Sequence, residues 1–486
     1  MAAVGEAPKQ IIIIGGGITG LSAAFYMRKL LAGQQISAEI TLVEKSSSLG
    51  GKIKTLRRDG FLIEQGPDSF MARKQPILDL TRELGLEREL VAANPKAKAN
   101  YILHKGRLHQ MPMGLMLGIP TEVTPFIKTG LLSPLGKLRA AFDLWLPKRG
   151  TTGDESLGGF IERRLGREVL EQVTEPLLAG IYAGDAKALS LQATFPQFRQ
   201  LEQRHRSLIL GMLASKKQAR EMPKELPEIA RRSLFLTFKG GLGSLIERLD
   251  EQLSSIRRLT GQAVTEVRRE GRRYQVRLEH GEELQADGVI MALPAYEAAV
   301  LLEESAEIQA QTQRQIQTLR DIPYVSVANI ALAYRPQDIK LPLNGSGFVV
   351  PRSEGRMITA CTWTSSKWLH TAPENHILLR AYIGHAGAQA WTKLTDRQLL
   401  DAVRQDLQAI MGITAEPLFT ELTRWGRSMP QYPVGHLEQL AKLREGLAVS
   451  HPGLLLCGSG YEGVGLPDCI GQGRQAAEAL LPFFKQ

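Results

Sequence analysis

The sequence predicts an α/β protein with several domains (α+β overall), in which a Rossmann-type dinucleotide-binding domain is assembled from three chain segments. Three features predict this fold class: an apolar strand that runs into a glycine-rich turn near the start, a strand meander in the middle, and a strand, turn and helix at the end. Strands alternating with helices favour a parallel sheet. A chain of 486 residues, 43% hydrophobic and 23% charged, is long enough for two or three domains.

The first segment begins with the β-branched run at residues 11–14, which is typical of a strand buried on both faces. Gly15, Gly17 and Gly20 follow with the spacing G-x-G-x-x-G, and apolar residues recur at helical spacing over residues 21–31. The first glycine permits a tight turn, the second lets the main chain approach a pyrophosphate, and the third lets the helix pack on the strand. The N-terminus of the helix adds unpaired N–H groups and partial positive charge.

The next strand, within AEITLVEK, ends at Glu44, roughly 20 residues beyond Gly20, where this motif places its ribose-binding carboxylate. An acidic residue there favours a ribose 2′-hydroxyl over a 2′-phosphate. Gly50, Gly51 and Lys52 come soon after and resemble the extended FAD signature of the flavoprotein class that includes amine oxidases and carotenoid desaturases. We therefore expect FAD as the cofactor.

Two later stretches complete the predicted domain. Residues 261–294 alternate like a three-stranded meander and end in an apolar strand. Residues 454–457 read as a strand, followed by a glycine-rich turn and a final helix through Leu481. In flavoproteins of the class named above, this last helix directs its N-terminus at the flavin ring, where its partial positive charge stabilises an anion.

Composition and cysteine use exclude other classes of protein. The three cysteines, Cys361, Cys457 and Cys469, form no C-x-x-C pair, which argues for a reducing compartment and against iron–sulfur or structural zinc sites. The nine histidines lack metal-ligand spacing, so we predict no metal. The start of the chain is too polar for a secretory signal, and no segment reaches the roughly 18 apolar residues of a membrane span. We expect a cytoplasmic protein.

The net charge of +10 has two interpretations. The charge either belongs to an ordinary solvated surface, or it attracts an anionic ligand or an anionic membrane surface. The basic residues are spread along the chain and are not gathered with aromatic residues, so nucleic acid is not an expected partner.

Four further motifs are more specific: IEQGPDSFMARK, EPLLAGIYAGD, RWGRSMPQYPVGH and YEGVGLPDCIGQG. Together they resemble the protoporphyrinogen oxidase family, most closely its short, soluble bacterial branch of coproporphyrinogen III oxidases, over essentially the whole chain. The resemblance implies an FAD-dependent enzyme of haem biosynthesis that oxidises coproporphyrinogen III to coproporphyrin III. Oxygen would reoxidise the noncovalent flavin and give hydrogen peroxide. Protoporphyrinogen IX is the alternative substrate.

The resemblance also assigns cofactor contacts. The residues at the pyrophosphate would be Gly15, Gly16, Gly17, Ile18, Thr19 and Gly20, with Glu44 and Lys45 at the adenosine ribose and Gly51 and Lys52 along the cofactor. Around the flavin ring would lie Gly66, Pro67, Asp68 and Ser69 beneath it, Trp425 over it, and Val464, Gly465 and Leu466 at the head of the last helix. The resemblance places Val264 beside adenine. From the residues alone, Val264 reads as a core valine, and Trp425 also fits a packed core.

For the substrate, the resemblance places Gly180 against the macrocycle. The large plant and animal members pair an arginine with a propionate near the position of Asn100, and this chain lacks that arginine. Basic residues nearby could supply positive charge instead: Arg73, Lys74, Lys105, Arg107 and His109. Any of them could equally be an ordinary surface residue. No catalytic side chain is identified beyond a tentative Lys74, because the expected chemistry needs chiefly a well-placed flavin N5.

Three domains are expected. The FAD-binding domain takes residues 1–55, 225–297 and 437–486, and a substrate domain with an antiparallel or mixed sheet takes residues 56–105 and 298–436. An α-helical domain takes residues 106–224, and it resembles the membrane-docking part of larger relatives. Its segment 111–150 mixes apolar patches with basic residues, so it is either a helical cap that lines the cavity or a membrane-interface piece. We expect the cap, with membrane contact at most peripheral and homo-oligomers as an open alternative.

Two rival functions share these glycines. A flavin amine oxidase would show an aromatic cage, and Cys469 at the start of the last helix could then tether the flavin, although its Pro-Asp-Cys-Ile setting fits the porphyrinogen motif better. A non-enzymatic porphyrin-binding chaperone would bind porphyrin without consuming oxygen.

Overall fold

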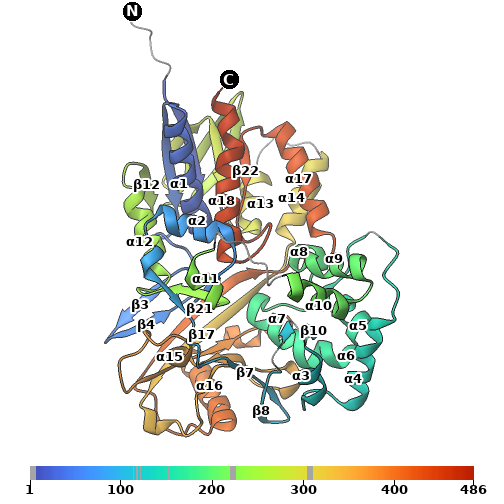
Figure 1. Cartoon of the computed structure of the whole chain (residues 1–486). Helices are drawn as coiled ribbons and strands as arrows, with labels where there is room; N and C mark the ends of the chain where they lie inside the picture. Colours follow the sequence, from blue (N-terminus) through green and yellow to red (C-terminus); the bar gives the residue numbers. More distant parts are fainter. Residues whose placement is uncertain are drawn as a thin grey trace, which may run out of the picture.

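The computed structural model describes residues 7–112, 114–116, 119–120, 122–151, 153–218, 226–303 and 310–485. Figure 1 shows a parallel sheet with its helices in the upper part, a large second sheet at the lower left, and a group of short helices at the lower right.

The upper sheet joins chain segments that are far apart in the sequence. All of its neighbouring strands are parallel, in the order β12-β2-β1-β16-β22. The strands are β1 (Lys9–Ile14), β2 (Ala38–Glu44), β12 (Arg257–Thr260), β16 (Gly288–Met291) and β22 (Leu454–Leu456). This arrangement, with helices on the sheet, confirms the predicted fold class of a Rossmann-type domain assembled from three segments.

The isoleucine run of β1 is buried on both faces of this sheet. Ile11 and Ile13 belong to the core with the helices α1 (Ile18–Gly33), α2 (Gln75–Glu83), α12 (Gly243–Gln252) and α18 (Leu466–Leu480). Ile12 and Ile14 belong to a second core on the opposite face. Helices α1 and α18 lie so close that a Cβ on Gly473 would stand 2.4 Å from the carbonyl oxygen of Thr19.

The second core lies under the predicted meander, which is confirmed as an antiparallel sheet of three strands in sequence order. They are β13 (Val264–Glu270), β14 (Arg273–Leu278) and β15 (Glu283–Ala286). The helices that accompany this face are α13 (Ala295–Glu303), α14 (Ala310–Arg320) and α17 (His436–Ser450).

The lower-left sheet has seven strands in the order β21-β17-β20-β19-β18-β7-β8, and only β18 and β7 run parallel. The strands are β7 (Ala99–His104), β8 (Arg107–Gln110), β17 (Tyr324–Tyr334), β18 (Gly345–Val349), β19 (Ile358–Thr362), β20 (Ile377–Ile383) and β21 (Phe419–Pro430). Helices α15 (Thr364–Lys367) and α16 (Asp396–Met411) accompany it. Antiparallel pairs with one parallel pair match the antiparallel or mixed sheet that was expected for the substrate domain. Strand β8 lies within the range expected for the helical domain, and the domain boundaries stay a prediction.

Short strands and turns connect these layers. The short strands are β3 (Thr55–Arg58) with β4 (Phe61–Glu64), β5 (Phe70–Met71) with β11 (Phe235–Phe238) and β6 (Leu90–Ala92), and β9 (Leu115–Met116) with β10 (Ile119–Pro120). The 3₁₀ turns are Glu87–Glu89, Phe142–Leu144, Pro336–Asp338, Arg352–Glu354, Ala390–Lys393 and Leu481–Phe484.

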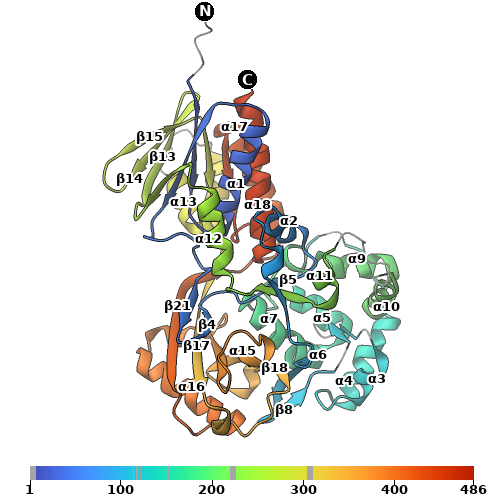
Figure 2. The ribbon, with the colours of Figure 1, turned by 60° about the vertical axis from the view of Figure 1, so that its left-hand side comes forward.

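The helices at the lower right of Figure 1, also seen in Figure 2, surround a separate apolar core. They are α3 (Val123–Lys128), α4 (Pro134–Ala141), α5 (Leu157–Leu165), α6 (Arg167–Val169), α7 (Glu175–Tyr182), α8 (Leu191–Thr194), α9 (Pro196–His205) and α10 (Leu208–Gln218), and α11 (Glu228–Arg232) follows. A π-helical turn, Leu170–Thr174, joins α6 to α7. Part of the segment 111–150 lies outside the described residues.

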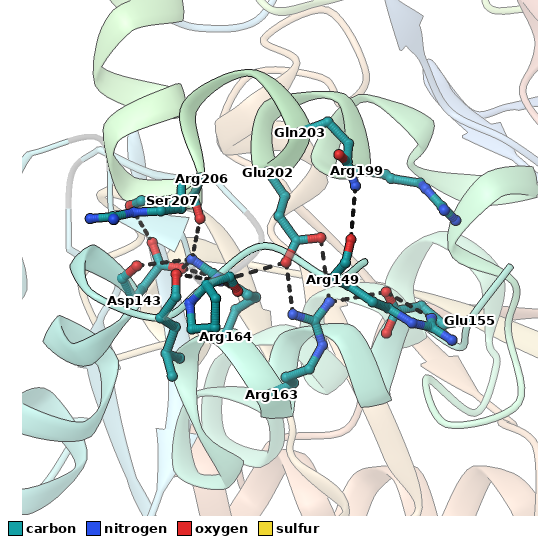
Figure 3. Close-up of polar contacts among 12 residues, drawn as sticks. Asp143, Arg149, Glu155, Arg163, Arg164, Arg199, Glu202, Gln203, Arg206 and Ser207 are labelled. Carbon is teal, nitrogen blue, oxygen red and sulfur yellow. Dashed lines mark hydrogen bonds and ion pairs between the residues drawn. The ribbon is translucent and has the colours of Figure 1, made fainter. Parts of the chain in front are cut away.

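A buried charge network ties these helices together (Figure 3). Arg164 of α5 has no solvent exposure, and its Nε donates to Oδ1 of Asp143 at 2.5 Å. It also donates to the carbonyl oxygens of Asp143, Leu146, Pro147 and Arg206. The network therefore satisfies a charge that would otherwise be costly to bury.

Among the described residues, no helix has the length and apolar character needed to cross a bilayer.

Candidate functional site

The first glycine turn is shaped by close backbone contacts. Gly15 has φ +106°, and a Cβ on it would lie 2.6 Å from the carbonyl oxygen of Ala292. A Cβ on Gly20 would lie 1.9 Å from the carbonyl oxygen of Gly15, so both positions require glycine. At Gly17 a Cβ would meet no atom within 4 Å. The two outer glycines thus serve the turn itself, whereas Gly17 leaves open space at the N-terminus of α1.

This open space meets the start of α1, where Ile18 and Thr19 are buried. Gly17 is the N-cap residue of α1. Because glycine has no side chain, no side-chain hydrogen bond caps the N–H groups of the first turn. Uncapped N–H groups at a helix N-terminus attract an anion. The geometry therefore fits a pyrophosphate at this turn.

Glu44 lies at the end of β2 beside that turn. Its Oε2 accepts from the N–H of Gly16 at 2.6 Å, and its Oε1 accepts from the N–H of Ser46 at 2.8 Å. Lys45 points elsewhere, because its Nζ pairs with Oε1 of Glu297 at 2.6 Å. Burial opposes the charge on Lys45, yet Glu297 outweighs it and raises the lysine pKa. Glu44 is thus held next to the glycine turn, and Lys45 is engaged with α13.

The second glycine pair packs directly on the first turn. The N–H of Gly50 donates to the carbonyl oxygen of Gly16 at 2.8 Å, and Gly17 and Gly50 form a parallel bridge. Gly51 has φ +59°, and a Cβ on it would approach Cα of Gly17 to 3.2 Å. The glycines of the two turns therefore lie side by side and leave main chain free of side chains. A long dinucleotide needs such a surface because it must approach the backbone closely.

Lys52 is half-buried close to both turns. Its Nζ donates to the carbonyl oxygen of Ser428, and among the described residues no carboxylate pairs with it. Burial lowers the pKa of Lys52, and Cys469 opposes that shift only in part. Burial raises the pKa of Cys469 to about 11, so this cysteine is a protonated thiol at neutral pH. A desolvated ammonium of this kind attracts an anionic ligand.

The head of α18 brings further predicted residues to the same region. Gly465 is the N-cap residue of α18, Leu466 begins the helix, and Val464 packs against the core of the helical region. In the first turn, Oδ1 of Asp468 pairs with Nζ of Lys74 at 2.9 Å. Lys74 therefore lies at the head of α18 and is about half exposed.

The turn 66–69 is fixed from below by buried polar groups. A Cβ on Gly66 would lie 1.8 Å from the carbonyl oxygen of Lys52, so this turn sits against the second glycine pair. Asp68 accepts from Ser69 Oγ at 2.6 Å and pairs with Lys367 at 3.3 Å. Burial would raise the pKa of Asp68, but the charges of Lys367 and Arg380 lower it overall. Pro67 is half-buried in the same turn.

Trp425 adjoins this turn from β21. Its Nε1 donates to the carbonyl oxygen of Gln65 at 2.7 Å, and the ammonium of Lys54 lies 5.9 Å from its ring centroid. Asn329 donates to the same carbonyl oxygen at 2.9 Å. Trp425 is half-buried, so its ring is not enclosed in a core.

Gly180 and Val264 mark two ends of the region. Gly180 is exposed on α7, and a Cβ on it would meet no atom within 4 Å. Burial raises the pKa of Tyr182, and Asp468 at the head of α18 adds to this shift, so the end of α7 lies near that head. Val264 begins β13 two residues after Gln262, whose N–H donates to the carbonyl oxygen of Glu44 at 3.0 Å.

Three of the other basic candidates, Lys105, Arg107 and His109, are not brought together with Lys74. Lys105 and the following glycine form the turn between β7 and β8, and their N–H groups donate to the carboxylate of Glu354. Arg107 and His109 lie on β8, at the edge of the seven-stranded sheet, while Arg73 and Lys74 precede α2 in the upper part of Figure 1. Asn100 lies in β7, paired with β18.

The sequence predictions missed two buried polar residues under the turn 66–69. Arg380 is 3% exposed and Asn329 is 5% exposed, and Nε of Arg380 donates to Oδ1 of Asn329 at 3.0 Å. A second nitrogen of Arg380 donates to the carbonyl oxygen of Gly66. The signal was present, because each residue interrupts an otherwise apolar strand, β20 or β17.

Where residues are described, no group of three His, Cys, Asp or Glu side chains could hold a metal ion. The two glycine turns, Glu44, the turn 66–69 and the head of α18 fit one extended dinucleotide. Fold and site together define a dinucleotide-binding oxidoreductase.

Known proteins narrow this class. Residues 18–481 match the family described as flavin containing amine oxidoreductase. The chain is 45% identical to coproporphyrinogen III oxidase of Bacillus subtilis (strain 168), with 98% of this chain and 99% of that protein covered. It is 39% identical to coproporphyrinogen III oxidase of Staphylococcus aureus (strain NCTC 8325 / PS 47), covering 97% and 99%. A solved structure from Exiguobacterium sp. 255-15, assigned as a protoporphyrinogen oxidase, superposes with TM-score 0.85 and 36% identity, covering 99% of this chain and all of that one.

The chain therefore belongs to the flavin-containing amine oxidoreductase family and, within it, to the group formed by coproporphyrinogen III oxidases and protoporphyrinogen oxidases. It is a flavoenzyme, and its cofactor is FAD, as the glycine motifs predicted.

Proposed function

We propose that this protein oxidises coproporphyrinogen III to coproporphyrin III in haem biosynthesis, with FAD as cofactor and oxygen as the final electron acceptor. The observation that carries the proposal is the meeting of the glycine turns, the turn 66–69 and the head of α18 in a chain 45% identical over its length to a coproporphyrinogen III oxidase.

The cofactor contacts in the proposal are those of the predicted residues. The first turn and the start of α1 bind the pyrophosphate, and Glu44 binds the ribose. The turn 66–69, held by Arg380 and Asn329, supports the flavin ring, and Trp425 flanks it. These contacts orient the ring before the substrate arrives, so little reorganisation is needed during the reaction.

FAD, when bound, supplies a two-electron acceptor for hydride from the substrate. The chain contributes charge and position around it. The partly desolvated ammonium of Lys52 and the N-terminus of α18 both favour negative charge near the cofactor. Lys74 can exchange its partner Asp468 for a carboxylate of the substrate, because both side chains are partly exposed. We assign no general base, since no described side chain stands out for that role.

The test uses the purified, FAD-loaded protein. Coproporphyrinogen III and protoporphyrinogen IX are supplied separately, and porphyrin fluorescence is followed together with oxygen uptake. We expect both signals with coproporphyrinogen III, at a higher rate than with protoporphyrinogen IX, and no oxygen uptake with primary amines. Acid should release the flavin, because Cys469 is a buried, protonated thiol. Activity on amines alone would overturn the proposal, and a preference for protoporphyrinogen IX would overturn the choice of substrate.

We also propose peripheral contact with an anionic membrane surface through one face of the helical region. Leu135, Leu138, Phe142 and Trp145 follow one another at helical spacing and are between 50% and 78% exposed. Ile127 lies alongside, since its carbonyl oxygen accepts from Lys137 Nζ at 2.7 Å. Exposed Lys128 and Lys148 flank the same stretch. Apolar side chains with a basic border fit the interface of an anionic bilayer.

Leu138→Glu is expected to abolish cosedimentation with vesicles of mixed phosphatidylglycerol and phosphatidylcholine, because it places a charge in the apolar face. Val449→Glu is the matched control, since Val449 is also an exposed apolar residue but lies on α17. Binding of both variants, or of neither, would contradict the assignment of this face. Pure phosphatidylcholine vesicles should bind the wild-type protein weakly. The formation of homo-oligomers stays a prediction, and sedimentation of the same protein samples without vesicles would test it.

A further inference from the structure

A small cavity lies directly under the turn 66–69. It measures about 10 Å³, the space of about one water molecule. Its walls come from β4, the turn 66–69, β11, β17, α15 with the segment after it, and β20. The polar wall residues used below are Glu64, Asp68, Thr364, Trp368, His370 and Arg380.

Buried polar atoms of the wall have no partner among the described residues. They are Nε1 of Trp368, which is 1% exposed, Oγ1 of Thr364, which is 7% exposed, and both ring nitrogens of His370. Leaving a buried polar atom without a hydrogen bond destabilises the folded protein. A polar cavity of this size normally holds an ordered water that satisfies such atoms. The wall is therefore built to hold water.

The inner end of the cavity belongs to the flavin site. Asp68 and Arg380 line it, and Arg380 also donates to the carbonyl oxygen of Gly66. Lys367 pairs with Asp68 from the side. The back of the turn that we place beneath the flavin ring is thus one wall of the cavity.

His370 lines the same cavity, and its neighbour in the chain, Leu369, is 70% exposed. The residue is half-buried, but both of its ring nitrogens are buried without a hydrogen-bond partner among the described residues. Burial lowers the pKa of His370, although the backbone of Phe238 opposes this, and the charge of Lys239 lowers it further. A neutral imidazole can accept a proton from cavity water on one nitrogen and release one from the other.

Glu64 lines the cavity together with Asp68 and His370. Its carboxylate is 7% exposed and accepts from the N–H of Leu242 at 2.6 Å and from Oγ1 of Thr55 at 2.8 Å. Burial raises the pKa of Glu64 to about 7, while these hydrogen bonds and the charge of Arg380 oppose the rise and Asp68 supports it. Its carboxyl group therefore gains and loses a proton near neutral pH.

We propose that the cavity is a hydrated proton path that connects the turn beneath the flavin to solvent through Glu64 and His370. This inference rests on the proposed function. Each two-electron oxidation takes a hydride and a proton from the porphyrinogen, and the hydride with one further proton converts oxygen to hydrogen peroxide. One proton thus leaves the substrate and one is taken up per cycle, and both must cross a site covered by protein.

The first experiment needs no substrate. The unfolding temperature of wild type, Glu64→Gln and the control Glu247→Gln is measured from pH 4 to pH 9, both with and without FAD. A raised pKa in the folded state adds stability below the unfolded pKa of 4.5, and this contribution is lost as pH rises through about 7. Glu64→Gln should lose that decline, whereas Glu247→Gln, an exposed residue paired with Arg57, should keep it. Parallel curves for wild type and Glu64→Gln would overturn the role of Glu64.

The second experiment follows proton release with an indicator dye in weakly buffered solution after anaerobic mixing with coproporphyrinogen III. His370→Leu is expected to slow release by about tenfold, less than the roughly 10²-fold loss typical of a direct general base. Free imidazole should restore the rate. His376→Leu is the control, because His376 lies close by in the chain but does not line the cavity.

Unchanged proton release in His370→Leu would overturn the path, and so would a high-resolution crystal structure with a dry cavity. If the wild-type protein does not oxidise porphyrinogens, the proposed function is wrong, and with it the role of the path in that reaction. The pH comparison would then still report whether Glu64 titrates in the cavity.

Discussion

Gly17→Val is expected to abolish tight FAD binding while the protein keeps its fold. Gly17 has φ −73° and ψ 177°, an extended conformation that valine adopts readily, and a Cβ there would meet no protein atom within 4 Å. The new side chain would occupy the space in which the pyrophosphate approaches the main chain. We expect the FAD dissociation constant to rise by about 10²-fold or more, equivalent to about 3 kcal/mol.

The measurement is a titration of the deflavinated protein with FAD, followed by flavin fluorescence. Gly33→Val is the matched control, because Gly33 ends the same helix and also has free space around its Cα. Equal circular dichroism spectra of the two variants would show that the fold is kept. If Gly17→Val bound FAD as tightly as Gly33→Val, the pyrophosphate would not lie at this turn.

Asp143→Ala is expected to destabilise the helical region by about 3–5 kcal/mol, the usual cost of leaving a buried charge without its partner. Asp143 and Arg164 are both fully buried, and Asp143 also accepts from Ser207 Oγ at 2.6 Å and from the N–H of Ile209 at 2.9 Å (Figure 3). The alanine would leave the guanidinium and these donors without their carboxylate. The loss should appear as a lower unfolding temperature and as faster proteolysis between residues 140 and 210.

Arg167→Ala provides the control for this prediction. Arg167 also belongs to an ion pair, with Glu171, but its side chain is 72% exposed. Exposed pairs contribute about 0–1 kcal/mol, so the variant should unfold close to wild type. Equal stability of Asp143→Ala and Arg167→Ala would show that the buried network contributes nothing to this region.

Much of the dinucleotide-binding sheet could be predicted because its signals are local. The isoleucine run is buried on alternate faces in two cores, and Gly15 and Gly20 are required by contacts within the same turn or with the adjoining strand end. The meander could be predicted from its alternation. The position of Glu44 beside Gly16 follows from strand adjacency, which the spacing of the motif already implied.

Other parts of the site could not be predicted in the same way. Arg380 and Asn329 support the turn 66–69 from strands more than 250 residues away along the chain. From the sequence, Lys105, Arg107 and His109 were as good candidates as Lys74. The structure places them in β8 and the turn before it, at the edge of the seven-stranded sheet, whereas Lys74 lies at the head of α18. Basic side chains are ordinary at any surface, so only their neighbours separate a ligand contact from a solvated charge.

The amino-acid sequence by itself determined the glycine turns, the strands they follow and the cofactor they hold, because backbone conformation and alternating burial depend on neighbouring residues. The tertiary structure decided which charges are buried together, which apolar helix face stays exposed and where a water-sized cavity lies. Those properties depend on desolvation by segments distant in the chain. Desolvation shifts the pKa values of Lys52 and Glu64 and makes the pair of Asp143 and Arg164 dependent on each other, which is why we propose these residues for cofactor binding, proton exchange and stability.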